Sequence, residues 1–209
     1  MRAGRPIFAG LLLSWLLVGS PPPPLPPQKA NANAFWNTKA PADWSIEEMR
    51  LILQRSPWAT VSHATLSVPI PIHLASAEPM REAELRERQA SRYRVEPGAS
   101  FEEYQAMLAE GKYIVLAVTM RDSSALADAI ESKSLERDSI MYAGRRAYRL
   151  VTVFPPTPGD PYIRYVFPRE VRPNDKSLNF DIYIPGVSYP QRHIEFDLKE
   201  MMYRGKLSY

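Results

Sequence analysis

Apolar residues recur at helical spacing near the start of the chain. Between residues 46 and 55 they follow one another at intervals of three and four, at Ile46, Met49, Ile52 and Leu53. This spacing places them on one face of a helix. Ser45 and Glu48 stand in the S-x-x-E order of a capping box, in which each side chain accepts a hydrogen bond from the backbone N–H of the other residue. Because Pro57 disfavours helical backbone at the residue before it, the pattern predicts a helix over Ile46–Arg55.

A second capping box opens another predicted helix. Ser100 and Glu103 have the same spacing, which indicates a helix over Phe101–Glu110. Gly111 ends it, because glycine readily adopts the left-handed backbone conformation that closes many helices. Two further helices are expected, a solvent-exposed one and a short one, over Met80–Arg94 and Ser124–Ser132.

The most continuous apolar run after residue 34 predicts a central buried strand. It covers Lys112–Met120, is rich in β-branched residues and is bounded by glycine and polar residues. A second apolar pattern alternates with period two over residues 66–72. Pro69 and Pro71 lie within it and cannot donate to a β-ladder, so this segment is expected to be an edge strand or an extended crossing.

The second half of the chain has the alternation typical of strands. Turn-rich sequences separate four such segments, Tyr148–Phe154, Tyr162–Phe167, Leu178–Ile184 and His193–Leu198. Their connections are too short for helical crossovers, so one mainly antiparallel sheet is expected. The apolar faces of the last two segments are predicted to share one core, through Phe180, Ile182, Phe196 and Leu198. The predicted helices lie mostly in the first part of the chain and the predicted strands mostly in the second. This order indicates an α+β fold, with N-terminal helices and a sheet formed largely by the C-terminal half.

The tail of the chain is apolar at Met201, Met202 and Tyr203, and alternates again from Gly205 to its end. We expect a last strand that docks into the protein's own sheet. The alternative is a strand offered to a partner by edge addition.

The first 34 residues have the order of a secretory signal peptide. Arg2 and Arg5 precede an apolar segment over Ile7–Val18, and small residues follow in Ala-x-Ala triplets. The apolar segment holds about twelve residues, whereas about twenty are needed to span a bilayer. A proline-rich stretch separates this segment from the triplets, over Pro21–Pro27.

Cleavage of the signal peptide is expected after Ala32 or Ala34, because a peptidase that reads an extended strand should not cut directly before a proline. The alternative is an uncleaved anchor, the one case in which we expect membrane association. The predicted organisation is a signal peptide with a proline-rich c-region over residues 1–34 and a single α+β domain over residues 35–209. We expect the protein to be exported, either periplasmic or secreted.

Loss of the signal peptide changes the charge balance. The chain has 26 basic and 23 acidic residues, and Arg2, Arg5 and Lys29 are the charged residues of the first 34, so the remainder is neutral. Neutrality gives no argument for nucleic acid, and no such partner is expected. Cysteine is absent from the chain, which excludes lipoprotein attachment, disulfides, thiolate zinc sites and cysteine nucleophiles.

Three tryptophans, Trp36, Trp44 and Trp58, lie within 23 residues of one another. They are candidates for an aromatic ligand surface, for a glycan or a peptide. The preferred interpretation is that they pack the first helix onto the body of the domain, because indoles carry large apolar areas.

No residue of the chain is assigned to catalysis, to a cofactor or to a metal. His63, His73 and His193 are the histidines of the chain, and none stands at a spacing that places two metal ligands on one helix face. The sequence contains no G-x-S-x-G elbow, S-x-x-K pair, P-loop, Rossmann glycine pattern or calcium loop. Arg172–Ser177 carries adjacent Asn and Asp residues, as in a turn.

Both ends of the chain resemble a family of exported bacterial proteins of unknown function. The opening FWNTKAPADWSIEEMRLILQRSPWA is similar to that family's W-x(n)-W-[ST]-x-E-E segment, which ends in S-P-W-A. The ending FDLKEMMYRGKLSY, over Phe196–Tyr209, and the V-F-P-R segment at Val166–Arg169 are similar as well. The resemblance implies export and a single unit, and it implies no catalytic or binding residue.

The functional hypothesis is a non-enzymatic binding or interaction module of the cell envelope, with an envelope partner or ligand that the sequence does not name. It follows from the export signal together with the lack of a recognisable catalytic motif. The alternative is an exported hydrolase without a local motif, in which His63, His73 or His193 acts as a base beside a carboxylate. A histidine in a concave pocket, with a carboxylate and a hydroxyl in reach, would favour the hydrolase.

Overall fold

The computed structural model describes residues 34–63, 68–90, 98–120 and 123–209. The predicted signal segment up to residue 33 lies outside this range, as do Leu66 and the last four residues of the predicted helix over Met80–Arg94. Within the described ranges, no helix is both long enough and apolar enough to cross a membrane.

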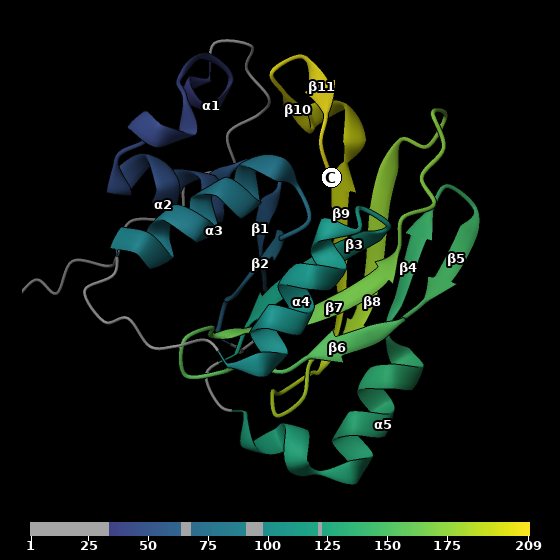
Figure 1. Ribbon diagram of the computed structural model, residues 1–209. Coiled ribbons are helices and arrows are strands. Elements are labelled where there is room, and N and C mark those ends of the chain that lie inside the picture. The colour runs from purple at the N-terminus through teal and green to yellow at the C-terminus, as the bar shows by residue number, and fades with distance from the viewer. Residues whose placement is uncertain (1–33, 64–67, 91–97, 121–122) are drawn as a thin grey trace, which may run out of the picture.

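Two large antiparallel sheets form the centre of the molecule (Figure 1). The described residues build a five-stranded sheet in the order β1 (Ala59–Ser62), β2 (Ile70–Leu74), β3 (Tyr113–Thr119), β7 (Tyr162–Pro168) and β6 (Thr152–Phe154). They build a four-stranded sheet in the order β5 (Arg146–Arg149), β4 (Ile140–Ala143), β8 (Ser177–Tyr183) and β9 (Gln191–Asp197). β1 lies against β9, and β5 lies against β7, so the sheets approach one another at two edges.

The α+β class is confirmed, but the prediction of one C-terminal sheet is wrong. The segment expected as one strand over Tyr148–Phe154 divides into β5, which pairs with β4, and β6, which pairs with β7 in the other sheet. The amide of Val151, between them, donates to the carbonyl of Val166 on β7. Alternation along a strand identifies its buried face, but it does not identify its neighbour, because strand pairing is a long-range choice.

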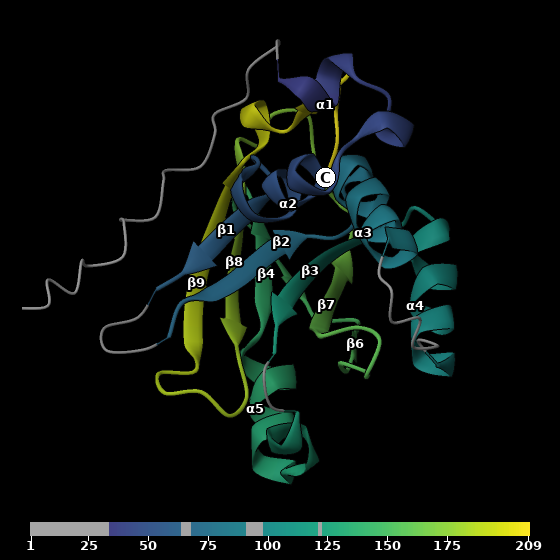
Figure 2. The same ribbon diagram turned by 90° about the vertical axis from the view of Figure 1, so that its left-hand side faces the viewer.

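The expected core of the C-terminal strands is confirmed. Phe180 and Ile182 of β8, together with Phe196 of β9 and Leu198, are buried in the main hydrophobic core between the two sheets. β3 is the central strand of the five-stranded sheet, as predicted, and is buried on both faces. A second, smaller core covers its other face, beneath helix α4 (Ala99–Ala109). Figure 2 shows α4 and α3 (Glu78–Ala90) on that side, away from the four-stranded sheet.

Helix α2 (Ile46–Arg55) forms over the predicted range. The Ser45 hydroxyl accepts from the Glu48 amide at 3.2 Å, and the Glu48 carboxylate accepts from the Ser45 amide at 2.7 Å, so the capping box is confirmed. Its apolar face is buried, through Met49, Ile52 and Leu53. Ahead of it lie the short helices α1 (Phe35–Thr38) and η1 (Pro41–Asp43).

The second capping box does not form. Helix α4 begins at Ala99 after Gly98, so Ser100 already lies inside the helix and its side chain makes no capping bond. The Gly98 carbonyl accepts from the Phe101 amide instead. Gly111 has φ +68°, the left-handed conformation expected at the end of this helix.

Two other expected helices differ in extent. The short one over Ser124–Ser132 is a 3-10 turn, η2 (Ser124–Ala127), followed by α5 (Ala129–Asp138). The Asp128 carboxylate separates them, because it caps α5 by accepting from the Ile130 and Glu131 amides. Helix α3 is not solvent-exposed on every side, since it buries Met80, Ala83 and Glu84.

The tail forms a separate two-stranded ribbon rather than a strand of either large sheet. β10 (Met202–Tyr203) and β11 (Lys206–Leu207) pair with each other after the 3-10 turn η3 (Leu198–Glu200). Arg204 and Gly205 both have positive φ, which suits a two-residue hairpin turn. The ribbon is anchored where the Trp58 indole donates to the Ser208 carbonyl at 2.7 Å.

Candidate functional site

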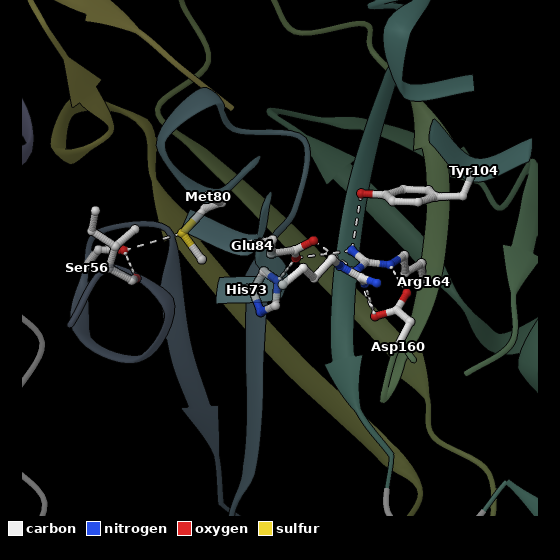
Figure 3. A network of polar contacts seen from close by, with 9 residues as sticks. Ser56, His73, Met80, Glu84, Tyr104, Asp160 and Arg164 are labelled. Atoms are coloured by element: carbon white, nitrogen blue, oxygen red, sulfur yellow. Dashed lines mark hydrogen bonds and ion pairs between the residues drawn. The ribbon is translucent and has the colours of Figure 1, made fainter. Parts of the chain in front are cut away.

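Charged side chains meet inside the molecule on the face of the five-stranded sheet that α3 and α4 cover. Ala117 of β3 pairs with His73 on β2 and with Arg164 on β7, so these two residues flank it on one face of the sheet. The small Ala117 side chain leaves room between them. Glu84 enters from the buried face of α3, and Asp160 lies just before β7 (Figure 3).

Arg164 is the centre of this network. Its side chain has no exposed area, and its guanidinium makes five hydrogen bonds. Two go to Glu84 at 2.9 and 3.2 Å, two to Asp160 at 2.9 and 3.0 Å, and one to the Tyr104 hydroxyl at 3.2 Å. A guanidinium has five N–H donors, so the hydrogen-bonding capacity of Arg164 is filled.

Glu84 joins the arginine to the histidine. Its Oε1 lies 2.5 Å from Nε2 of His73, and the edge of the Tyr162 ring packs on the imidazole at 4.9 Å between centroids. Burial raises the pKa of Glu84, but the charge of Arg164 and the contacts with His73 outweigh it and lower the pKa to about 2. Glu84 is therefore ionised at neutral pH, although it is buried.

A second arginine completes the charge balance. Arg88 of α3 contacts Asp160 at 2.9 Å, donates to the Gly159 carbonyl at 2.9 Å, and stacks over the Phe101 ring at 3.9 Å. Two guanidinium groups thus face two carboxylates, and their formal charges cancel. Burial raises the pKa of Tyr104 above its usual value, so this phenol stays protonated beside Arg164.

A groove lies between α3 and α4 above the network. Its volume is about 460 Å³. One wall comes from α3 and the other from α4, with lining residues Glu78, Arg81, Glu82, Glu84, Leu85 and Arg88 on α3 and Phe101, Tyr104, Gln105 and Leu108 on α4. Glu84 and Tyr104 belong both to the groove and to the network, so the network fixes part of the groove's lining.

The three tryptophans lie elsewhere, in the main core. Trp36, Trp44 and Trp58 are 1, 6 and 0% exposed, and Trp36 packs edge-to-face on Trp58. Their positions agree with the packing interpretation, since a ligand would have to open the core to reach an indole face.

The three histidines have separate surroundings. His73 belongs to the network and is 2% exposed, His193 pairs with Asp181 at 2.7 Å on an exposed face of the four-stranded sheet, and His63 is exposed beyond β1. In the part of the chain that the structure describes, no hydroxyl is hydrogen-bonded to His73 or His193, and no group of three or more metal-binding side chains occurs.

The sequence patterns do not identify the other members of the network, Glu84, Arg88, Tyr104, Asp160 and Arg164. One signal was available. Arg164 interrupts the apolar run of the segment predicted over Tyr162–Phe167, and a charge inside a buried strand requires a buried partner. The identity of that partner depends on how α3 crosses the sheet, which the local pattern does not contain.

No protein-family model, no curated protein and no solved structure matches this chain. The interpretation of the site therefore rests on its geometry.

Proposed function

We propose that this chain is an exported, non-enzymatic binding module of the cell envelope, and that its ligand occupies the groove between α3 and α4. The proposal is supported by the network beside the groove, in which Arg164 makes its hydrogen bonds within the protein. Each guanidinium N–H of Arg164 has an acceptor within the protein, and His73 is almost completely buried. The network holds the groove's shape and presents no exposed base or nucleophile to a ligand.

A groove held in this way binds with little loss of conformational freedom. Ordering of loops and side chains is a large part of the free-energy cost of binding. Here Glu84 and Tyr104 are already fixed by Arg164, and Arg88 is fixed by Asp160 and Phe101. The ligand therefore meets a preformed surface.

The rim of the groove indicates the kind of ligand that fits. Arg81 and Gln105 are exposed on opposite walls, and Arg81 makes no ion pair with another described residue. Leu85, which is 52% exposed, adds apolar surface on the α3 wall. We infer a ligand that combines polar groups with an apolar portion.

The test compares the envelope material that the native protein retains with the material that a groove variant retains. Protein recovered from a secretion-competent host is immobilised and exposed to a solubilised envelope fraction. Gln105→Trp fills the groove from an exposed position, so we expect it to fold normally and to lose the material that the native protein retains. Glu195→Gln, on the exposed face of β9, is the matched control and should retain it. Equal retention by Gln105→Trp and the native protein would contradict the assignment of the groove.

A hydrolase remains the second candidate, because the 2.5 Å contact between His73 and Glu84 supplies the histidine and carboxylate that it needs. The burial of His73 argues against the hydrolase, since a base must reach the proton that it abstracts. Chromogenic ester, glycoside and peptide substrates separate the two functions. Turnover by the native protein that disappears in a folded His73→Gln variant would establish the hydrolase and overturn the proposal.

A further inference from the structure

A free sheet edge lies where the chain passes from one large sheet to the other. β6 is the outermost strand of the five-stranded sheet, and among the described residues it pairs with β7 alone. β5 precedes it by two residues and pairs with β4 instead. One edge of β6 therefore has backbone N–H and C=O groups without a strand beside them, and such an edge is a template for another strand.

The edge segment itself lacks two features that commonly protect edge strands, a charged side chain and a proline, although β6 is only three residues long. Residues 150–154, with the sequence LVTVF, carry no charge and no proline. Val151 is 48% exposed, which is a large fraction for an aliphatic side chain. Pro155 and Pro156 follow directly and limit the length of any added pairing to this short segment.

A pocket adjoins this edge. It has a volume of about 520 Å³ and lies between α5 with its preceding turn and the β5–β6 segment. Its walls combine aliphatic and polar surface, with lining residues Leu126, Ser132, Leu135, Glu136, Leu150, Val151, Thr152, Val153 and Pro155. Alternate side chains of a strand point to the same face, so a strand added to β6 would direct side chains toward this pocket.

Glu136 supplies the charge preference of the pocket. It is the one charged residue of the lining, it is exposed, and it makes no ion pair with another described residue. A basic residue on the added strand would complement it.

We propose that the free edge of β6 binds an extended peptide segment of a partner protein as an added strand, with an aliphatic side chain in the pocket against α5 and a basic residue facing Glu136. Peptide recognition of this kind takes affinity from main-chain hydrogen bonds and specificity from side-chain pockets. This surface is distinct from the groove between α3 and α4 and does not depend on its assignment.

The probe is a fluorescein-labelled seven-residue peptide in which valine, threonine and leucine alternate between two terminal lysines. Its fluorescence anisotropy is measured with protein recovered from a secretion-competent host. We expect saturable binding and new protection against hydrogen exchange for those backbone amides of β6 that point away from β7. The same peptide with alternate amides N-methylated keeps its side chains but loses main-chain donors, and it should not bind. Equal binding of both peptides would overturn strand addition.

The charge preference is tested by Glu136→Lys, an exposed substitution that should leave the fold intact. We expect it to weaken binding of the lysine peptide by about two- to fivefold, as befits a surface ion pair, and to strengthen binding of an analogue with terminal glutamates. Glu195→Lys makes the same charge change on β9 and should alter neither affinity. Unchanged affinities in Glu136→Lys would overturn the pocket assignment. Protection of the outward-pointing amides of β6 in a dimer of the protein alone would assign the edge to a second copy of this chain and overturn the proposal as well.

Discussion

The guanidinium of Arg164 is enclosed by Glu84, Asp160 and the Tyr104 hydroxyl, and the side chain is almost completely buried. A buried ion pair of this kind is not itself a large source of stability, because desolvation offsets most of the attraction. Removal of one partner is costly, however, since the other charge is left buried without compensation. We therefore expect the network to fix how α3 and α4 sit on the sheet more than to add to the free energy of folding.

Arg164→Met should destabilise the protein by about 3–5 kcal/mol, because Glu84 then loses its two hydrogen bonds to the guanidinium. Urea unfolding measures the effect. Arg149→Met, at an exposed position on β5, is the matched control and should change the free energy of unfolding by less than about 0.5 kcal/mol. Replacing Glu84 by Leu in the Arg164→Met background should recover part of the loss. A loss below that of the control would show that the pair is not buried as described.

The ionised state of Glu84 links stability to pH. Its pKa is lowered from 4.5 to about 2 in the folded protein, so the unfolded chain takes up its proton first as the pH falls. The stabilisation is complete above pH 4.5, is lost progressively down to pH 2, and amounts to about 3 kcal/mol for this one group. Urea unfolding at pH 2–5 should show this slope in the native protein and a shallower one in Glu84→Gln. Identical slopes would contradict the lowered pKa.

The sequence predicts best those elements that depend on interactions between residues close together in the chain. The capping box of α2 involves residues three positions apart, and both of its hydrogen bonds form. The second box does not form for a local reason too, because α4 begins at Ala99, two residues before Phe101, and Ser100 therefore lies inside the helix. The division of Tyr148–Phe154 between two sheets could not be predicted, since it depends on whether β4 or β7 lies alongside.

The same limit applies to the candidate site. The sequence offers His73 as one of three histidines that could act as a base beside a carboxylate, whereas the pattern around Glu84 predicts a solvated helix. The apolar positions of α3 are few, so its pattern alone does not show that one turn faces the sheet. Burial of Glu84 follows from the position of Arg164 on β7, which is 80 residues further along the chain.

The facing of β9 is tested by a pair of adjacent substitutions. Phe196 is buried against Phe180, with ring centroids 6.0 Å apart, whereas Glu195 points to solvent. Phe196→Ala should cost about 3–5 kcal/mol of unfolding free energy, because it leaves a cavity in the main core. Glu195→Ala should change it by less than about 0.5 kcal/mol. Thermal or urea unfolding of the two variants distinguishes these outcomes, and equal effects would mean that the facing of the strand is wrong.

The main core and the proposed binding groove lie in different layers of the molecule. The main core between the sheets holds the tryptophans and the aromatic residues of β8 and β9. The smaller core under α4 lies beside the charged network and the groove. Substitutions at the groove rim therefore leave the main core unchanged, so the binding hypothesis can be tested by mutation.

Export is a prediction about the whole chain that N-terminal sequencing decides. Protein recovered from a secretion-competent host should begin at Asn33 or Phe35, because cleavage is expected after Ala32 or Ala34. The structure describes the chain from residue 34 onward. Trp36, which follows the expected cleavage sites, is buried in the main core. An intact N-terminus in the membrane would establish an anchor instead, and retention in the cytosol would contradict export.

We propose that the groove between α3 and α4 binds its ligand without changing it chemically. The most direct test is the mass of the retained envelope ligand before and after prolonged incubation with the native protein, measured by mass spectrometry. We expect that the ligand is recovered intact, that the native protein's unfolding temperature rises in its presence, and that Gln105→Trp shows no such rise. A ligand cleaved by the native protein and left intact by His73→Gln would contradict a binding function without catalysis.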